Sequence, residues 1–572
     1  MDHLSNFRMM SSIDFYSSVM HKPLHWLYSK ISNQIIKIAM LVVLQSFLSF
    51  LSVIYAIFFR YLLDSASNES GSMIREYSIA FLSLLLVQCL LNTFYKHQKE
   101  MTTVTIENRL KESTIRNIYC HDYSYVSAVH SGDWMNKIFN DVSVVARNAV
   151  NLLPNLAGII IHIITAMIIL IRLIPGFMTI IFLMISGALV FELVYSKKIK
   201  SLHKVVQEKD GELRVFVQEQ LKSLMVIKSY SKEKWSLRQL FSYLDEYRNA
   251  RRRKSLFSVI MNFFFGTGLN GVLILSAVYC AFGVFEHKLS YGTFVAVVQI
   301  VTQLRSPVAG AYSSIPNYFS MIGSIERLMQ VENYKKETEF SESAVPDFDE
   351  IQIDHVFFSY QKDLEDMRYF MEDLTFTIKK GSFIGISGPS GCGKSTLFKL
   401  LLNLYEPNKG DIRVLRNNTE CLLGNERRKL FAYVPQDNQL MKGTIRQIIC
   451  FGLDYDAKKM DSVLKISCCD EFVSLLPEGI ETELKESGSG LSQGQMQRIA
   501  IARALYSDRQ ILLLDEVTSA LNEDLEITVL NNLRSLSDKT VLFITHRKKA
   551  FKFVDIQLKC EEREGGLVWS AI

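Results

Sequence analysis

The stretch "ISGPSGCGKSTLFKLL", from Ile386 to Leu401, decides how the second half of this chain folds. It follows a short apolar segment, opens a helical run, and contains the pattern G-x-x-x-x-G-K-[ST]. The glycines allow backbone N–H groups to curl around phosphate oxygens, and the helix N-terminus favours negative charge. Lys394 is placed to reach the β- and γ-phosphates, and Ser395 to offer its hydroxyl to Mg²⁺. The stretch predicts an α/β domain of the P-loop NTPase type with ATP and Mg²⁺ as cofactors.

A second motif downstream, "ILLLDE", adds the acids that such a site needs. Its aliphatic residues predict a buried strand that delivers Asp515 to the Mg²⁺ shell. Glu516, the next residue, is placed to polarise the attacking water. Alone, this pattern is equally typical of a core strand capped by acids, but downstream of a phosphate loop it indicates ATP hydrolysis.

The first half of the 572 residues holds long apolar runs, and 48% of the whole chain is hydrophobic. A bilayer core of ~30 Å requires about 20 apolar residues in a helix. The predicted spans are 34–59, 77–95, 150–171, 174–195, 256–284 and 293–319. The last contains Arg305, Pro307 and Pro316, so we expect it to face protein or a water-filled cavity, and the alternative is an amphipathic surface helix.

The loops between these spans predict the orientation. Segments 96–147 and 197–254 are long and rich in Lys and Arg, whereas the other three loops are short and nearly uncharged. By the positive-inside rule the long loops are cytoplasmic, and six spans then place both termini in the cytoplasm. We predict an integral protein of the lipid bilayer, expected in a bacterial plasma membrane, with its ATPase domain cytoplasmic.

Charge and cysteine content indicate neither a nucleic-acid-binding protein nor a disulfide-bonded one. The net charge is +5, and no basic tail interleaved with aromatic residues indicates nucleic-acid binding. The nine cysteines show no C-x-x-C pair and read as reduced thiols. The N-terminus lacks the pattern of a cleavable signal.

"LSQGQMQRIAIARAL", followed by "ILLLDEVTSALNE", resembles the ATPase domain of ABC transporters. With six spans ahead of it, the chain resembles an ABC half-transporter of the exporter type. The resemblance implies a membrane all-α six-helix domain followed by an α/β P-loop NTPase domain of the ABC type. The expected boundaries are 1–30 for an N-terminal cytoplasmic segment, 31–330 for the transmembrane domain, 331–348 for a linker and 349–572 for the nucleotide-binding domain.

The resemblance also implies roles for individual residues. Tyr360 in "VFFSY" would stack on adenine, Gln436 in "VPQD" would touch Mg²⁺, and His546 in "FITHR" would contact the γ-phosphate and the attacking water. The catalytic residues would thus be Glu516, His546 and Gln436, and the metal ligands Ser395, Gln436 and Asp515. The remaining nucleotide contacts would come from Gly388, Ser390, Gly391, Cys392, Gly393, Lys394, Ser395 and Thr396.

Ser492, Gly494 and Gln495 would form the signature that closes on ATP held by the other subunit. Two residues depart from the family pattern. Gln493 replaces the usual first Gly of the signature, which would cost about 1 kcal/mol if that position required φ > 0. Asn522 replaces the usual Asp after "SAL", keeping an acceptor but losing a charge. "SGDWMNKIFNDV" and "VQEQLKSLMVIKSY" resemble the family's first and second coupling regions, which link the membrane domain to the ATPase domain.

The implied function is ATP-driven export of a peptide, lipid or amphipathic small molecule by a dimer, a homodimer being favoured because this chain carries both halves of a competent site. An importer on the same architecture and an ATP-gated channel or sensor remain as alternatives. The substrate is unknown. Polar residues in the predicted spans either line a cavity or hydrogen-bond between helices. These residues are His162, Asn262, Asn270, Gln299, Gln303 and Arg305.

Overall fold

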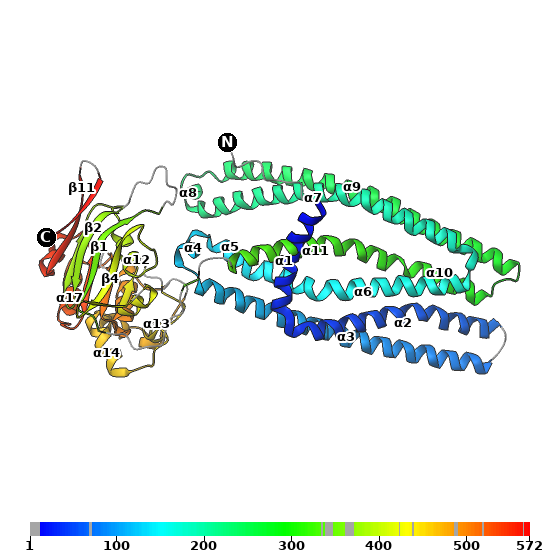
Figure 1. Ribbon diagram of the computed structural model, residues 1–572, viewed down its shortest axis with the longest axis horizontal. Helices are drawn as coiled ribbons and strands as arrows, with labels where there is room; N and C mark the ends of the chain where they lie inside the picture. Colours follow the sequence, from blue (N-terminus) through cyan, green and yellow to red (C-terminus); the bar gives the residue numbers. More distant parts are fainter. Residues whose placement is uncertain are drawn as a thin grey trace. The chain divides into compact units, whose positions relative to one another are not determined.

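The chain forms two compact units in a computed structural model (Figure 1). The first comprises Met1–Ile115 and Gly132–Glu332, and the second Arg116–Ser131 and Asn333–Ile572. The structure describes residues 12–67, 71–332, 336–337, 347–360, 371–422, 424–437, 440–485, 490–517, 520–563 and 566–572. Most of the expected linker, 331–348, lies outside these residues.

The first unit is helical, because a chain in hydrocarbon must satisfy its backbone hydrogen bonds within each segment. Among the described residues, four stretches are long and apolar enough to cross a membrane, namely Lys22–Ser67, Gly71–Cys120, Ser131–Leu173 and Glu233–Phe285. The predicted helical membrane domain is therefore confirmed. Its main helices are α1 (Ser12–Ile31), α2 (Ile35–Ser67), α3 (Gly71–Cys120), α5 (Ser131–Met135), α6 (Val142–Leu173), α7 (Met178–Lys222), α8 (Leu224–Ser229), α9 (Glu233–Phe285), α10 (Tyr291–Gln303) and α11 (Arg305–Glu332).

The sixth expected span is divided into two helices, α10 and α11, with a break at Leu304. Pro307 contributes to the break, because it has no N–H to donate to the carbonyl four residues earlier and lies in the first turn of α11, where that N–H is not needed. Ser290 caps the start of α10 by accepting from the N–H of Thr293 (3.1 Å). Asp64 at the end of α2 accepts from the N–H of Gly292 (3.0 Å) and so ties the two helices together.

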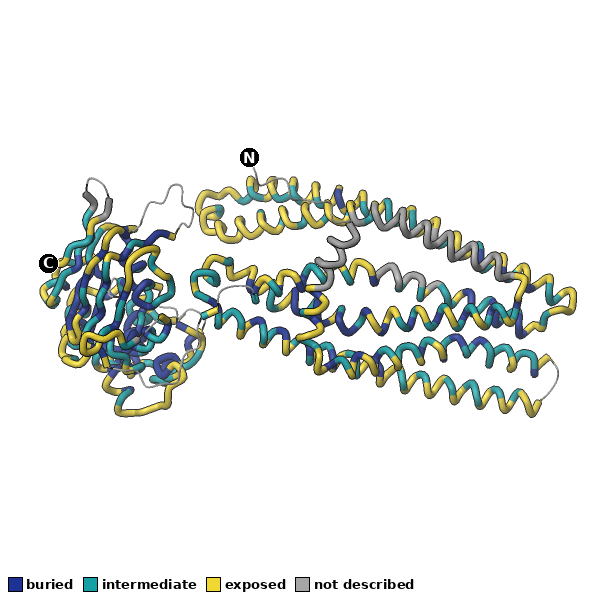
Figure 2. The backbone as a smooth tube through the Cα atoms, in the orientation of Figure 1, coloured by how far each residue is buried: buried dark blue, intermediate teal, exposed yellow. Residues whose placement is uncertain are grey.

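Within this unit α2 packs against α6, α6 packs against α11, and α10 lies against both α2 and α9. The side chains of Leu41, Val150 and Ile300 are fully buried between these helices. By contrast, much of α3 is exposed (Figure 2), and its exposed residues include apolar ones such as Leu86 and Leu90. Such a surface is stable in contact with lipid and unfavourable in water.

The second unit contains the predicted α/β domain. Its largest sheet has the strand order β12-β11-β3-β10-β9-β6, in which only β12 is antiparallel to its neighbour. A second sheet, of order β2-β1-β4-β5, is antiparallel. The strands of both sheets are β1 (Glu350–Phe358), β2 (Met371–Lys379), β3 (Phe383–Ser387), β4 (Lys409–Arg416), β5 (Thr419–Leu422), β6 (Phe431–Val434), β9 (Ile511–Asp515), β10 (Thr540–Ile544), β11 (Ile556–Arg563) and β12 (Gly566–Ala571).

Strands β9 and β10 are wholly buried, which accounts for their unbroken apolar sequences. Because β3, β6, β9 and β10 run parallel, their carboxyl ends lie at one edge of the sheet. The phosphate loop, Gln436, Glu516 and His546 follow these ends, and Asp515 is the last residue of β9. The helices beside them are α12 (Lys394–Leu401), α16 (Gln493–Tyr506) and α17 (Glu523–Arg534).

Candidate functional site

The phosphate loop joins β3 to α12 and contains three glycines in the left-handed region of backbone space. Gly388, Gly391 and Gly393 have φ of +155°, +85° and +94°. A Cβ at Gly388 would lie 2.8 Å from Sγ of Cys392, so a larger residue does not fit. Lys394 Nζ donates to the carbonyl oxygens of Gly388 (3.0 Å) and Pro389 (2.9 Å). The lysine thus lies across the mouth of the loop, where phosphate oxygens would take over its hydrogen bonds.

Ser395 and Asp515, the expected metal ligands from α12 and β9, lie together. Ser395 Oγ donates to Oδ1 of Asp515 (2.9 Å), and Tyr433 Oη donates to Oδ2 (3.1 Å). Asp515 is 2% exposed and makes no ion pair among the described residues. Burial raises the pKa of this carboxyl. A buried carboxylate beside a hydroxyl and without a cation fits a divalent metal ion.

The three expected catalytic residues also come together. Glu516 Oε2 accepts from Nε2 of Gln436 (2.8 Å), and Glu516 Oε1 lies 3.2 Å from Nε2 of His546. Glu516 has φ of +52°, an unfavourable backbone conformation for a residue with a side chain. Such conformations concentrate at functional sites. The carboxylate is held between two polar groups at the edge of the sheet, as a general base requires.

Tyr360, expected to contact adenine, follows β1 and reaches the helix after the phosphate loop. Its hydroxyl lies 3.0 Å from Oγ1 of Thr396, and its ring is 46% exposed. The ring packs edge-on against Tyr405 at 5.3 Å between centroids. The ring of Tyr360, which is exposed beside the phosphate loop, is therefore supported by the ring of Tyr405.

Two residues near Asp515 and Lys394 were not predicted from sequence motifs. Tyr433 orients Asp515, and its position in a strand three residues before Gln436 is the signal that could have pointed to it. Cys560 on β11 lies against Cys392, its Sγ being 3.9 Å from the Cys392 carbonyl oxygen. A hydrogen bond with the Cys560 thiol and the nearby ammonium of Lys394 lower the pKa of Cys392 to about 7. No sequence signal pairs these cysteines, because they lie far apart in the chain.

The signature residues form a helix start of their own. Ser492 caps α16: its Oγ accepts from the N–H of Gln495 (3.3 Å), and its N–H donates to Oε1 of Gln495 (2.8 Å). Gln493 is the first residue of that helix, so the expected steric cost of φ > 0 does not arise. A Cβ on Gly494 would lie 3.0 Å from the carbonyl oxygen of Ala520, which explains the glycine at this position.

Asn522 performs a similar task for the next helix. It caps α17 by accepting from the N–H of Leu525 through Oδ1 (2.8 Å). Asn and Asp cap helices about equally well. Asn522 therefore keeps the side-chain oxygen that caps α17, and the negative charge of the usual Asp is not required for this cap.

Comparisons with known proteins agree with this arrangement. A family model described as ABC transporter matches residues 371–519, and one described as ABC transporter transmembrane region matches 35–308. The chain is 31% identical to the chloroplastic ABC transporter B family member 29 of Arabidopsis thaliana, over 74% of this chain and 67% of the relative. The chain belongs to the ABC transporter family.

Two bacterial proteins are also similar to this ABC transporter. The putative export ATP-binding/permease protein of Rickettsia bellii is 25% identical, over 87% of each chain. The structure of a bacterial Atm1-family ABC exporter with ATP bound is similar in fold, with a TM-score of 0.75 at 22% identity, over 92% of this chain and 93% of the other. The chain is thus an exporter-type, ATP-driven membrane transporter, and its ATPase domain couples hydrolysis to transport.

A short helix from the first long loop of this ABC transporter belongs to the ATPase unit. It is α4 (Tyr123–Ala128). Ser127 Oγ lies 3.0 Å from Oη of Tyr405, and Tyr123 packs edge-on against the same ring at 6.0 Å. The contact lies just before the stretch expected to form the first coupling region. Tyr405 therefore touches both α4 and Tyr360, a link that local sequence patterns did not reveal.

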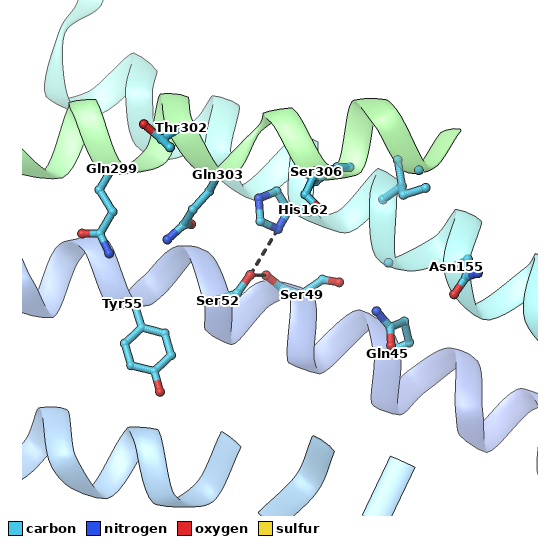
Figure 3. A pocket seen from close by; sticks show the side chains of 14 residues that line it. Gln45, Ser49, Ser52, Tyr55, Asn155, His162, Gln299, Thr302, Gln303 and Ser306 are labelled. Carbon is cyan, nitrogen blue, oxygen red and sulfur yellow. Dashed lines mark hydrogen bonds between the residues drawn. The ribbon is translucent and has the colours of Figure 1, made fainter. Parts of the chain in front are cut away.

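Three of the expected polar residues line a cavity in the membrane unit of the transporter. Gln299, Gln303 and His162 point from α10 and α6 toward α2 (Figure 3). Asn262 and Asn270 do not line this cavity, and the side chain of Arg305 lies outside the described part of the structure. Nδ1 of His162 lies 3.1 Å from Oγ of Ser52. Gln299 and Gln303 therefore line the cavity, whereas His162 both lines it and bonds to the neighbouring helix α2.

Proposed function

We propose that two copies of this chain form an exporter that carries a cargo out of the cytoplasm, with two ATP sites shared between the copies. The observation that carries the proposal is the cluster of Glu516, Gln436 and His546 beside a complete phosphate loop. Attack by water on a phosphate requires a positioned acceptor for its proton, and Glu516 is the carboxylate available for that role. Asp515 is engaged by Ser395 and Tyr433 instead.

The residues of the phosphate loop would bind the nucleotide. Lys394 would exchange its bonds to the loop carbonyls for bonds to phosphate, and the exposed face of Tyr360 would stack on adenine. Ser395, Gln436 and Asp515 would hold Mg²⁺, which when bound neutralises phosphate charge. Burial and the neighbouring Asp515 raise the pKa of Tyr433, so its hydroxyl keeps its proton and continues to orient that carboxylate.

The signature supports a dimer. In the described part of the chain, Ser492 and Gln495 are bonded to each other, and no hydrogen bond joins them to the phosphate loop. One chain supplies one phosphate loop and one signature, so two shared sites require two chains. Because both elements are intact here, we favour a homodimer over a heterodimer.

The second long loop supports the same assembly. Its tip, α8, exposes a run of apolar side chains, and Met225 is 85% exposed. Water disfavours such a surface, whereas a second copy of the chain would cover it. The exposed residues are Leu224, Met225, Val226 and Tyr230.

We place the transporter in a bacterial plasma membrane, with both termini and the ATPase units in the cytoplasm.

Reconstitution into liposomes tests direction and coupling together. With the ATPase units outside the liposome and ATP added there, an exporter accumulates its cargo inside. Cargo loss from preloaded liposomes under the same conditions would indicate an importer. Ion current gated by ATP, without cargo movement, would indicate a channel.

A further inference from the structure

Two pockets follow one another along the same helices of the membrane unit. The first, called here the polar cavity, has a volume of about 710 Å³ and lies between α2, α6, α10 and α11. The second, called here the apolar groove, has a volume of about 700 Å³ and lies between α1, α2, α6 and α11. Each falls within the ~300–1,000 Å³ typical of small-molecule sites.

The polar cavity presents hydrogen-bonding atoms that have no partner. Nε2 of His162, Oε1 of Gln299 and Oε1 of Gln303 are buried and unpaired among the described residues. His162 itself is 8% exposed. Polar atoms that are buried away from water without a hydrogen-bond partner are unfavourable. If each side chain rotated toward the polar cavity, a bound molecule with its own donors and acceptors would supply the missing partners.

The polar cavity also carries no formal charge in the part of the chain that the structure describes. Its polar lining consists of carboxamides, hydroxyls and one imidazole, such as Gln45, Ser49 and Tyr55. Moving an ionised group from water into such a site without a counter-charge is costly. The described part of the lining therefore favours an uncharged group that both donates and accepts hydrogen bonds, such as an amide or a polyol.

The apolar groove differs in chemistry. Its floor is made by buried side chains, among them Leu27 and Leu152, and its rim by exposed ones, among them Tyr28 and Phe319. Helix α1 forms one wall and is held to the end of α11, where Nε1 of Trp26 donates to Oε2 of Glu332 (2.6 Å).

The two pockets share the same helix faces. On α6, Asn148 and Leu152 line the apolar groove, and Asn155, Ile159 and His162 line the polar cavity. Steps of three or four residues place all five positions on one stripe of the helix.

The same stripe pattern recurs on α11. Pro307 and Gly310 line the polar cavity, and Ser314, Tyr318 and Met321 line the apolar groove. A molecule lying along this pair of helices would therefore meet hydrogen-bonding groups at one end and hydrocarbon at the other.

We infer that the cargo is an amphipathic molecule with an uncharged, hydrogen-bonding head and a hydrocarbon tail. The head occupies the polar cavity against Gln299, Gln303 and His162, and the tail occupies the apolar groove beside α1. This inference rests on the proposed function as an exporter, and it narrows the cargo from peptides, lipids and drugs in general to one chemical type.

Binding of a matched probe series to the full-length transporter in lipid nanodiscs tests the inference. The probes are dodecanoylglycinamide, dodecanoylglycine, which has the same tail but an ionised head, and acetylglycinamide, which has the head without the tail. Without nucleotide, we expect the first to bind about tenfold more tightly than either of the others, after correction for empty nanodiscs. A diazirine at the tail end of the first probe should label residues of the apolar groove.

Single substitutions separate the two ends of the site. Gln303→Leu, or Gln299→Leu as a second variant, should abolish the preference for the amide head, whereas Asn262→Leu removes a carboxamide outside the polar cavity and should not. Ile315→Trp narrows the apolar groove and should weaken the tailed amide about tenfold. Ile36→Trp, next to a groove residue but 83% exposed, is its control.

Equal binding of the ionised probe, or labelling outside the apolar groove, would overturn the inference. If the transporter hydrolyses ATP and moves another cargo but does not bind the amide probe, this inference fails while the proposed function stands. If it binds the probe as expected but cannot hydrolyse ATP, the proposed function fails instead.

Discussion

Glu516 is held between Gln436 and His546 in an unfavourable backbone conformation, and its replacement by Gln is the most direct test of the catalytic assignment. Gln has nearly the same shape but cannot accept the proton of the attacking water. We expect Glu516→Gln to slow ATP hydrolysis by about 10²–10⁴-fold, as for loss of a general base. ATP binding should persist, because Lys394 and Tyr360 are unchanged, and a closed ATP-bound dimer should accumulate.

Phosphate release and nucleotide retention after gel filtration measure the two effects. Glu523→Gln is the matched control, because this acid lies in the first turn of α17 and pairs with Lys549 (3.0 Å), away from the cluster. Near-normal hydrolysis by Glu516→Gln would refute the assignment. Loss of ATP binding would show that the acid is structural.

Gln493 illustrates how a departure from a family pattern is resolved by backbone geometry. Since it occupies a helical position at the start of α16, Gln493→Gly relieves no strain and costs at most about 1 kcal/mol of helix stability. We expect steady-state ATPase activity to stay within about tenfold of the original, a barrier change of about 1.4 kcal/mol. Gly494→Ala should be more harmful, because the new Cβ would press on the Ala520 carbonyl oxygen. The reverse ranking would contradict this account.

The reactivity of the Cys392 thiol should depend on pH. The pKa of Cys392 is lowered to about 7, and the hydrogen bond with the Cys560 thiol is the largest cause. Cys392 is 1% exposed, so its alkylation by iodoacetamide should be slow. Because only the thiolate reacts, the rate should still rise with pH and reach half its maximum near that pKa. Cys560→Ala should move the midpoint upward, toward the ~8.5 of an ordinary thiol. Mass spectrometry of the phosphate-loop peptide measures the rate, and an unchanged midpoint in Cys560→Ala would contradict the stated cause.

At the scale of elements, Tyr405 links α4 to the nucleotide site. Its ring meets Tyr123 on one side and Tyr360 on another, and each aromatic pair contributes about 0.5–1.5 kcal/mol. Tyr405→Leu should loosen α4 and speed amide hydrogen exchange in residues 116–131 by about fivefold, roughly 1 kcal/mol. It should also reduce stimulation of the ATPase by cargo.

Two variants control this experiment. Tyr405→Phe keeps the ring and loses only the hydrogen bond to Ser127, so most of the protection should remain. Tyr455→Leu removes a half-exposed ring elsewhere in the ATPase unit and should leave residues 116–131 unchanged. Equal exchange in Tyr405→Leu and the original protein would mean that α4 docks by other contacts.

The same elements show what the sequence could predict. Strands β3 and β9 were predictable because an apolar run that ends in a phosphate loop or in two acids is typical of a buried strand. The split between α10 and α11 was signalled by Pro307, but its position depends on where the first turn of α11 begins. The docking of α4 on Tyr405 joins residues far apart in the chain, and neither periodicity nor motif spacing carries such information. The capping roles of Gln495 and Asn522 likewise became visible only once the ends of α16 and α17 were fixed.

At the scale of the whole molecule, the central prediction is that each ATP site takes its phosphate loop from one chain and its signature from the other. Lys394→Ala removes the lysine that would bind phosphate, and Ser492→Arg removes the signature hydroxyl and fills its place. A dimer of either variant alone has two damaged sites, so each should be nearly inactive. A mixed dimer has one intact site and one site damaged on both sides.

Mixing the two variants therefore distinguishes shared sites from private ones. Random association makes half of the dimers mixed, and one working site in each gives about a quarter of the original ATPase rate. Purification through different affinity tags on the two chains isolates the mixed dimer and should raise this to about half. If each chain held a private site, every site in the mixture would still be damaged and no activity would return. Recovery on mixing thus requires that two chains complete one another, and its absence, with both variants shown to assemble, would remove the dimeric mechanism.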